Sequence, residues 1–349
     1  MDNLTHTLTG VALSQAGLNR KTRFATLALI VGSNLPDADI VTRLAGSATY
    51  LEYHRGITHS VLGVVVLSAL LAGAIYYLGR AAQPPKKRHT PPLDGRWLLA
   101  ICLIALASHV LMDLTNTYGV RILSPFSGRW YAWDILYIID PVLLALLMAG
   151  LGLPAIFRLV SEEVGASKPG FRRGAIFSLW CLVLLCGLRG FAHRRVLGML
   201  ESHTYGGENP RRVGAFPSPA DPFAWTGVAE TDSSFRVLAA NARDDDVDAE
   251  RASVLHKPEP SPVLDAAMKA RTAVIFANFA RFLWRQVAEG EDGYEVTLRD
   301  LRFYSPDERS PDDRSADTKL RGFVAKIDLD KSLRVRSESF SFLGESRAR

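Results

Sequence analysis

The sequence predicts an α-helical membrane protein with about four transmembrane helices, a short N-terminal helical hairpin and a C-terminal extracytoplasmic α+β domain. Charge is divided unevenly: residues 1–192 carry 17 Lys and Arg and 10 Asp and Glu, whereas residues 193–349 carry 24 and 26. Long apolar stretches occur only in the first part, and strand-like alternation only in the second. We therefore predict a membrane-embedded helical domain over 1–192, a linker over 193–222 and a soluble α+β domain of unknown role over 223–349.

Four apolar stretches approach the roughly 20 residues that a membrane-spanning helix needs. They are Ser60–Gly79, Trp97–Thr117, Asp134–Phe157 and Gly174–Ala192. Two earlier apolar stretches, 4–18 and 24–33, are too short to cross about 30 Å of hydrocarbon. These two are expected to form a hairpin beside the spanning helices or an interfacial pair.

Loop charge predicts the orientation of these spans. Basic residues concentrate between the first and second spans and between the third and fourth: Arg80, Lys86, Lys87, Arg88, Arg96, Arg158, Lys168, Arg172 and Arg173. Only Arg121 and Arg129 lie between the second and third. Because basic loops stay in the cytoplasm, the chain is expected to be a multi-pass protein of the bacterial inner membrane with its C-terminal domain outside.

The C-terminal part alternates like strands at Trp225–Glu230, Phe235–Ala239, Tyr294–Tyr304, Leu320–Leu329 and Leu333–Phe342. An amphipathic helix is predicted from Val263 to Ala288. The three cysteines lie in apolar segments and form no CxxC motif. The net charge of +5 is dilute and no basic tract is interleaved with aromatics, which argues against nucleic acid as a partner. No cleaved signal peptide is expected at the N-terminus.

The second predicted span carries His109 and Asp113, four residues apart and therefore on one face of a helix. A carboxylate inside an apolar helix needs a cation or a donor. A single metal ion could bind both side chains, or the pair could form a hydrogen bond that ties helices together. Taken alone, the spacing leaves both interpretations open.

Further candidate ligands fall at the same predicted depth, the outer ends of the apolar segments. His54 and His59 flank Gly56 just before the first span, and Asp37 and Asp39 follow Pro36. With these we select His6, Asp37, His54, His59, His109 and Asp113 as metal ligands, and Asp39 and Arg55 as catalytic residues. Asp134 and Asp140 are second-rank candidates, and His89, His193, His203 and His256 are not selected.

Imidazole and carboxylate ligands without thiolate suit Zn²⁺, and also Mn²⁺ or Fe²⁺. Because more than four ligands are available, we expect one to three ions, with zinc favoured. Such ions activate water and polarise a scissile oxygen. Asp39 or Asp37 would then be the general base or would orient a ligand. Arg55 would clamp an anionic phosphate or anchor a headgroup.

The motifs His6-Thr7, Leu35–Asp39, His54–Ser60 and Ser108-His109-x3-Asp113 resemble the YdjM-like family of bacterial inner-membrane, metal-dependent hydrolases. The resemblance covers roughly residues 1–160 and implies a membrane hydrolase whose metal ligands are these His and Asp residues. It leaves the role of the C-terminal half open.

The favoured function is therefore a phosphoesterase at the outer face of the membrane, with membrane lipids as partners and a lipid headgroup as substrate. Two alternatives stay open. A transporter or proton relay would use His109, Asp113 and Asp140 as a chain through the membrane. A non-catalytic sensor would hold a structural metal in a filled ligand set.

Overall fold

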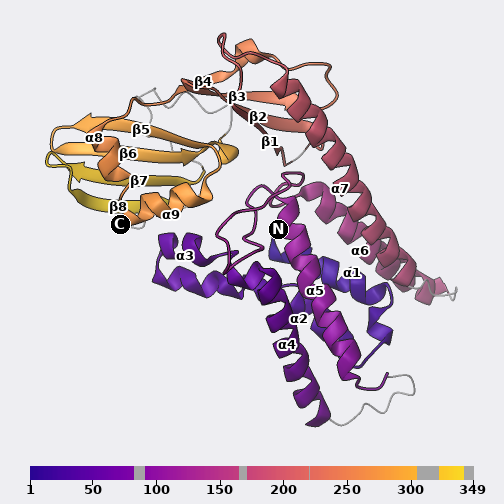
Figure 1. Cartoon of the computed structure of the whole chain (residues 1–349). Coiled ribbons are helices and arrows are strands. Elements are labelled where there is room, and N and C mark those ends of the chain that lie inside the picture. Colours follow the sequence, from indigo (N-terminus) through magenta and orange to yellow (C-terminus); the bar gives the residue numbers. More distant parts are fainter. Residues whose placement is uncertain (82–90, 165–170, 220, 305–321, 342–349) are drawn as a thin grey trace. The chain divides into compact units, whose positions relative to one another are not determined.

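The computed structural model describes residues 1–81, 91–164, 171–219, 221–304 and 322–341 (Figure 1). The chain forms two compact units. The first comprises Met1–Ile40, His54–Phe191 and Pro219–Pro222, and the second comprises Val41–Tyr53, Ala192–Ser218 and Phe223–Arg349. The expected linker, 193–222, contains the end of a long helix and a β-strand rather than a continuous connector.

The first unit is helical. In chain order its elements are α1 (Asn3–Gln15), η1 (Leu18–Arg20), α2 (Ala25–Gly32), η2 (Leu35–Ala45), η3 (Ile57–His59), α4 (Val61–Ala81), α5 (Gly95–Thr115), α6 (Pro141–Val164) and α7 (Phe171–Glu201). Of these, η2 continues into the second unit after Ile40, as does α7 after Phe191. The predicted short hairpin is present as α1 and α2, which contact each other.

Three helices within the described residues are long and apolar enough to cross a membrane: α4, α5 and α7. The predicted span at Asp134–Phe157 differs, because its helix begins only at Pro141 and its apolar part, Pro141–Pro154, is shorter. Asp140 explains the late start: its carboxylate accepts the Leu143 amide at 3.0 Å, and proline is favoured in the first turn. In place of the four expected spans, the described residues thus contain three helices of spanning length and composition and one helix, α6, whose apolar part is shorter.

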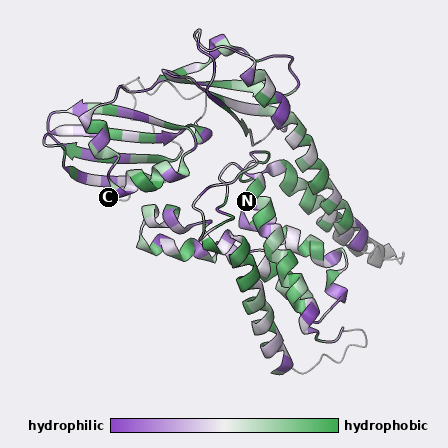
Figure 2. Ribbon diagram, viewed as in Figure 1, coloured by the Kyte–Doolittle hydropathy of each residue, from purple (hydrophilic) through white to green (hydrophobic). Residues whose placement is uncertain are grey.

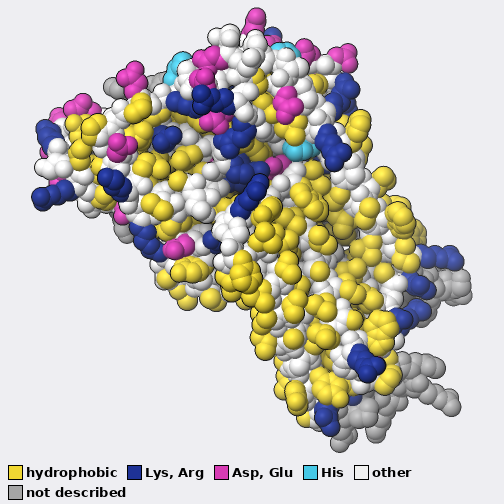
Figure 3. Space-filling model, in the orientation of Figure 1, with side chains coloured by type: hydrophobic (Ala, Val, Ile, Leu, Met, Phe, Trp, Pro, Cys, Tyr) yellow, Lys and Arg dark blue, Asp and Glu magenta, His cyan; other side chains and the backbone are white. Residues whose placement is uncertain are grey.

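The long helices differ in burial. In its most apolar stretch, α5 is 61% buried within the unit, whereas α4 is 22% and α7 is 28% buried. Large apolar side chains such as Leu70, Tyr77, Trp180 and Leu184 are exposed on α4 and α7. Hydrophobic residues predominate along these helices in the ribbon coloured by hydropathy (Figure 2), and hydrophobic side chains cover much of the helical unit in the space-filling view (Figure 3). Exposed apolar surface of this extent is typical of lipid-facing helices.

A buried ion pair joins α6 and α7. Arg189 Nη2 lies 3.1 Å from Asp140 Oδ2, and neither side chain is exposed. The two helices also approach closely where a Cβ added to Gly174 would meet the carbonyl oxygen of Gly150. Asp140 is therefore engaged in helix packing rather than in the cluster described below.

The second unit contains two antiparallel four-stranded sheets. The first sheet has the order β1 (Arg212–Pro217), β2 (Ala224–Glu230), β3 (Ser234–Asn241) and β4 (Ser253–His256), with η4 (Ala249–Arg251) before β4. The second has the order β5 (Leu283–Gly290), β6 (Gly293–Asp300), β7 (Val324–Asp330) and β8 (Val335–Ser341), with η5 (Leu301–Phe303) after β6. The short helices α8 (Pro262–Ala267) and α9 (Arg271–Phe279) precede the second sheet.

The prediction of a helix from Val263 to Ala288 was wrong for the second half of this range. The helical part ends at Phe279, and Leu283–Gly290 forms β5. Ala280 has extended backbone angles, and the residues that follow pair along their length with β6. Pairing with a distant strand therefore overrides the helical pattern in this stretch.

Helix α3 (Ser47–Tyr53) belongs to the second unit although it lies between elements of the first in sequence. It contacts α9 and β8. Arg271 Nη2 lies 2.6 Å from Glu52 Oε2 across the contact with α9. The chain therefore leaves the first unit after Ile40 and returns to it at His54.

Candidate metal centre

Four elements of the first unit bring the candidate ligands together. His6 comes from α1, Asp37 and Asp39 from η2, His59 from η3, and His109 and Asp113 from α5. The turn before α4 is closely packed, since a Cβ added to Gly63 would collide with the carbonyl oxygen of Ile57. This close approach fixes η3, and with it His59, against the start of α4.

Four ligand atoms lie close enough together to share one metal ion. His59 Nε2 is 3.1 Å from His109 Nε2, and Asp37 Oδ1 is 3.4 and 3.6 Å from these two nitrogens. Asp113 Oδ2 is 3.3 Å from His59 Nε2 and 3.5 Å from His109 Nε2. Ligands about 2.0 Å from a zinc ion at tetrahedral angles would be about 3.3 Å apart. The buried His and Asp cluster could therefore bind a metal ion.

The second ring nitrogen, Nδ1, of both His59 and His109 is held by a neighbouring group. His109 Nδ1 lies 2.8 Å from the carbonyl oxygen of Ser33, so it must carry the proton. His59 Nδ1 lies 3.0 Å from Thr58 Oγ1 and 3.5 Å from Asp39 Oδ2. Such partners orient an imidazole and leave Nε2 available as a ligand.

The cluster favours a positive charge. Burial raises the pKa of Asp37, but hydrogen bonding to His59 and the charge of His109 lower it to about 2. Burial alone would lower the pKa of His59, yet hydrogen bonds to Asp113, Asp37 and Asp39 raise it to about 10. The carboxylates therefore stay ionised near neutral pH and attract a cation, and His59 without a metal carries a proton that a bound ion would displace from Nε2.

Among the candidate metal ligands, Asp113 Oδ2 and both ring nitrogens of His6 are buried without a hydrogen-bond partner in the described part of the chain. His6 is fully buried, stacks on His109 with 3.8 Å between ring centroids, and has Nε2 3.4 Å from Asp113 Oδ1. Burial, followed by the charges of the Met1 amino group and His109, lowers the pKa of His6 to about 3, which keeps the ring in its neutral, ligating form. Unpaired polar atoms in this position fit a bound metal ion.

Asp39 and His54 form a second group beside the first. His54 Nδ1 lies 2.7 Å from Asp39 Oδ1, and the Arg55 amide and Thr58 hydroxyl donate to Asp39 Oδ2 at 3.0 and 2.9 Å. Burial raises the pKa of Asp39, and hydrogen bonds from His54 and His59 outweigh this and lower it. Asp37, Asp39 and His54 together also have the spacing of metal ligands.

Arg55 lies inside the cluster, with only 4% of its surface exposed. Its Nη2 is 3.0 Å from Asp113 Oδ1, its Nη1 donates to Asn116 Oδ1 at 3.1 Å, and its guanidinium covers the Tyr118 ring at 4.8 Å. The Met1 amino group is also paired with Asp113 Oδ1. Sequence reasoning missed Asn116 and Thr58. The one available signal for Asn116 was its position three residues after Asp113.

The remaining candidates lie apart from the cluster. Asp134 is buried with φ 57° and belongs to neither ligand group, and Asp140 pairs with Arg189. In the second unit, His193 packs on Trp225 and His203 lies 3.3 Å from Asp246. His89 is outside the described residues.

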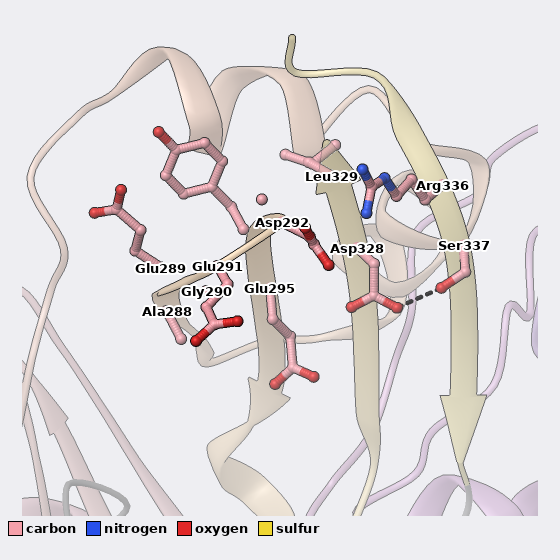
Figure 4. A pocket seen from close by; sticks show the side chains of 12 residues that line it. Ala288, Glu289, Gly290, Glu291, Asp292, Glu295, Asp328, Leu329, Arg336 and Ser337 are labelled. Atoms are coloured by element: carbon pink, nitrogen blue, oxygen red, sulfur yellow. Dashed lines mark hydrogen bonds between the residues drawn. The ribbon is translucent and has the colours of Figure 1, made fainter. Parts of the chain in front are cut away.

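A shallow hollow of about 550 Å³ lies in the second unit, around the turn between β5 and β6 and the adjoining parts of β7 and β8 (Figure 4). Carboxylates line it, including Glu289, Glu295 and Asp328, and the last of these accepts a hydrogen bond from Ser337. The hollow is open and has no histidine or cysteine in its lining. We assign it no function.

Apolar helices of spanning length and a buried His and Asp cluster define a membrane protein with a candidate metal centre. Residues 1–196 match the family described as YdjM inner membrane protein, and the chain belongs to this family. It is 24% identical over 322 residues to the uncharacterized protein YfhP of Bacillus subtilis (strain 168), covering 87% of this chain and 88% of the relative. No solved structure matches the chain.

Proposed function

We propose that the protein is a membrane-bound, metal-dependent hydrolase that acts on a phosphoester, such as a lipid headgroup, at the outer face of the cytoplasmic membrane. The close spacing of Asp37 Oδ1, His59 Nε2, His109 Nε2 and Asp113 Oδ2 carries the proposal. Zinc is the favoured ion because the set combines two imidazoles with two carboxylates, and Mn²⁺ or Fe²⁺ also suit it.

A divalent cation in this position supplies Lewis-acid activation of water and of a phosphoryl oxygen. His59, His109 and Asp113 hold the ion from the buried side, since their side chains are fully enclosed. The side chain of Asp37 is 13% exposed, so substrate would approach on its side of the ion. His6 would extend the ligand set next to Asp113, within a total of one to three ions.

The roles of Asp39 and Arg55 follow from their contacts. Asp39 already accepts from His54, the Arg55 amide and Thr58, so we assign it to orienting His54 and His59. Asp37 has the most open carboxylate of the three in the cluster, and its Oδ2, which is not in the ligand set, is the better placed general base. Arg55 offsets the charge of Asp113 and reduces the repulsion that a phosphate would meet.

A lipid substrate is supported by exposed apolar side chains in η2, the element that carries Asp37 and Asp39. In this element Ile40 is 54% and Leu44 is 94% exposed. Apolar groups exposed in this way are typical of an element that rests on a membrane surface.

The orientation of the spans is tested by labelling. Loop charge places the segment between α5 and α6 outside. A cysteine introduced by Ser127→Cys should therefore react with an impermeant thiol reagent added to intact cells. Reaction only after the membrane is opened would invert the topology.

The activity is tested on the full chain purified in detergent. Metal content is measured by mass spectrometry, and phosphate or headgroup release is measured from mixed phospholipid vesicles with added Zn²⁺ or Mn²⁺. His109→Ala and Asp113→Asn should lose both the metal and the release, while His203→Ala, a histidine of the second unit, should keep both. Full metal content in both ligand variants would refute the site.

A second function is favoured by one observation, namely that four protein ligands can fill a tetrahedral site without leaving a position for water. The metal would then be structural and the protein a non-catalytic sensor. Stoichiometric metal together with no release from any vesicle would support this function over hydrolysis.

A further inference from the structure

The carboxylate of Asp113 presents its two oxygens to different partners. Oδ1 contacts Arg55 Nη2 at 3.0 Å and Asn116 Nδ2 at 3.3 Å, and it also pairs with the Met1 amino group. Oδ2 has no hydrogen-bond partner among the described residues and faces the Nε2 atoms of His59 and His109. One oxygen is therefore held by donors, and the other is left for a cation.

We propose that Asn116 is a positioning residue that, together with Arg55, fixes the carboxylate of Asp113 so that Oδ2 is the oxygen presented to the metal. The proposal rests on the metal centre of the proposed function. It assigns a role to a residue that supplies no ligand atom of its own.

The hydrogen bonds of Asn116 determine which way its amide points. The side chain is fully buried, and its Oδ1 accepts from the Tyr118 amide at 2.9 Å, the Gly119 amide at 3.3 Å and Arg55 Nη1 at 3.1 Å. Three donors on one atom require that this atom be the oxygen. The NH₂ group must then point at Asp113, so the amide cannot flip without losing these bonds.

Arg55 is held in an uncommon conformation that aims it inward. Its φ of 54° lies in the left-handed region, which costs energy for a residue with a side chain. The Arg55 amide donates to Asp39 at 3.0 Å, and the Arg55 carbonyl accepts from the Arg121 amide at 3.0 Å. These bonds offset the cost and place the guanidinium between Asp113 and Asn116.

Without the contacts from Asn116 and Arg55, the Asp113 carboxylate could rotate about its terminal bond and present either oxygen, or both, to the ion. Partners that orient metal ligands in this way are worth about 10- to 100-fold in metal affinity. Loss of Asn116 should therefore weaken metal binding and alter the coordination geometry without removing any ligand.

The test uses the full chain in detergent. Zn²⁺ affinity is measured by competition with a chromophoric chelator, and the visible absorption of bound Co²⁺ reports the geometry. Asn116→Ala should bind Zn²⁺ about 10- to 100-fold more weakly and shift the Co²⁺ bands. Asn116→Asp keeps an acceptor for Arg55 but sets a carboxylate oxygen against Asp113, so it should also shift the bands.

Asn34→Ala is the matched control. Asn34 is a partly buried asparagine whose side-chain amide donates to Thr7 Oγ1 and the Ile30 carbonyl. Its contact with a proposed ligand is made by the backbone carbonyl, which accepts from the Asp37 amide and is kept in the variant. This variant should keep wild-type affinity and spectrum. Thermal unfolding of every variant separates a loss of fold from a loss of positioning.

Wild-type affinity and spectrum in Asn116→Ala would overturn the proposal, as would a lower melting temperature with an unchanged spectrum. If Asn116→Ala does not fold, Arg55→Lys replaces it as the test. Lysine keeps the positive charge but lacks the guanidinium that bonds to both Asn116 and Asp113. An unchanged Co²⁺ spectrum in this variant would overturn the proposal. A shifted spectrum in a protein that releases no phosphate would leave this inference standing and refute the hydrolase. Phosphate release together with unchanged metal binding in Asn116→Ala would refute this inference and support the hydrolase.

Discussion

Replacing Asp113 with asparagine should destabilise the first unit strongly, even without metal. The substitution keeps the shape of the side chain but removes the negative charge that Arg55 contacts at 3.0 Å and that the Met1 amino group also meets. Asp113 is fully buried and Arg55 is 95% enclosed, because only 5% of its side chain is exposed. Leaving such a cation without its partner costs about 3–5 kcal/mol.

The effect is measured as the melting temperature of Asp113→Asn in detergent with a chelator present, so that metal loss makes no contribution. A loss of this size lowers the melting temperature by on the order of 10 °C in a unit of this length. Asp94→Asn is the control on the same helix, because Asp94 caps the start of α5 and asparagine caps equally well. It should melt close to wild type.

A second substitution tests the physical reason. If the loss comes from an unpaired buried charge, adding Arg55→Met to Asp113→Asn should recover most of it, since a well-packed apolar pair often replaces a buried ion pair without loss. A double variant that melts lower than the single variant would refute this reasoning. So would a wild-type melting temperature for Asp113→Asn.

Three further predictions concern metal binding, the Asp140–Arg189 pair and the exposed Leu44. Saturating a chelator-treated sample with Zn²⁺ at 100 times its dissociation constant should stabilise the protein by about 2.7 kcal/mol, and a melting curve unchanged by Zn²⁺, Mn²⁺ or Fe²⁺ would argue against any bound ion. Asp140→Asn should keep the cap of α6 but remove the negative charge that faces the buried Arg189, which costs about 3–5 kcal/mol; a melting temperature equal to that of wild type would contradict this. Leu44→Asp should reduce headgroup release from vesicles several-fold but leave hydrolysis of a soluble phosphoester unchanged, whereas equal losses on both substrates would exclude a role in membrane contact.

The sequence predicted the proximity of His109 and Asp113 because helix geometry alone places residues four apart on one face. It also predicted that His54, His59 and Asp37 would meet them, because span orientation put the ends of several segments at one depth. Both arguments use short-range geometry and a membrane boundary. The described residues place Asp37 and His59 beside His109 and Asp113, whereas His54 lies in the neighbouring group with Asp37 and Asp39. Their role as metal ligands stays a prediction.

Other features could not be predicted from local pattern. The inward direction of the Arg55 side chain depends on a left-handed backbone conformation. An arginine in the sequence gives no indication of such a conformation. Asn116 looked like an ordinary residue at the end of a helix, and its role depends on contacts with Arg55 and Asp113. The pairing of Leu283–Gly290 with β6 depends on tertiary structure and not on the local pattern, so the prediction of a helix there was wrong.

The path of the chain through α3 has a consequence for how the protein can be divided. The excursion Val41–Tyr53 into the second unit starts two residues after Asp39 and ends directly before His54, and these two side chains meet at 2.7 Å. The Asp39–His54 contact therefore closes the loop formed by the residues between them, and Arg271 of α9 pairs with Glu52 of that loop. A chain cut after residue 196 would keep the whole family region yet remove α9 and β8, on which α3 packs. The segment that separates Asp39 from His54 in the sequence thus depends for its packing on elements that lie outside the family region.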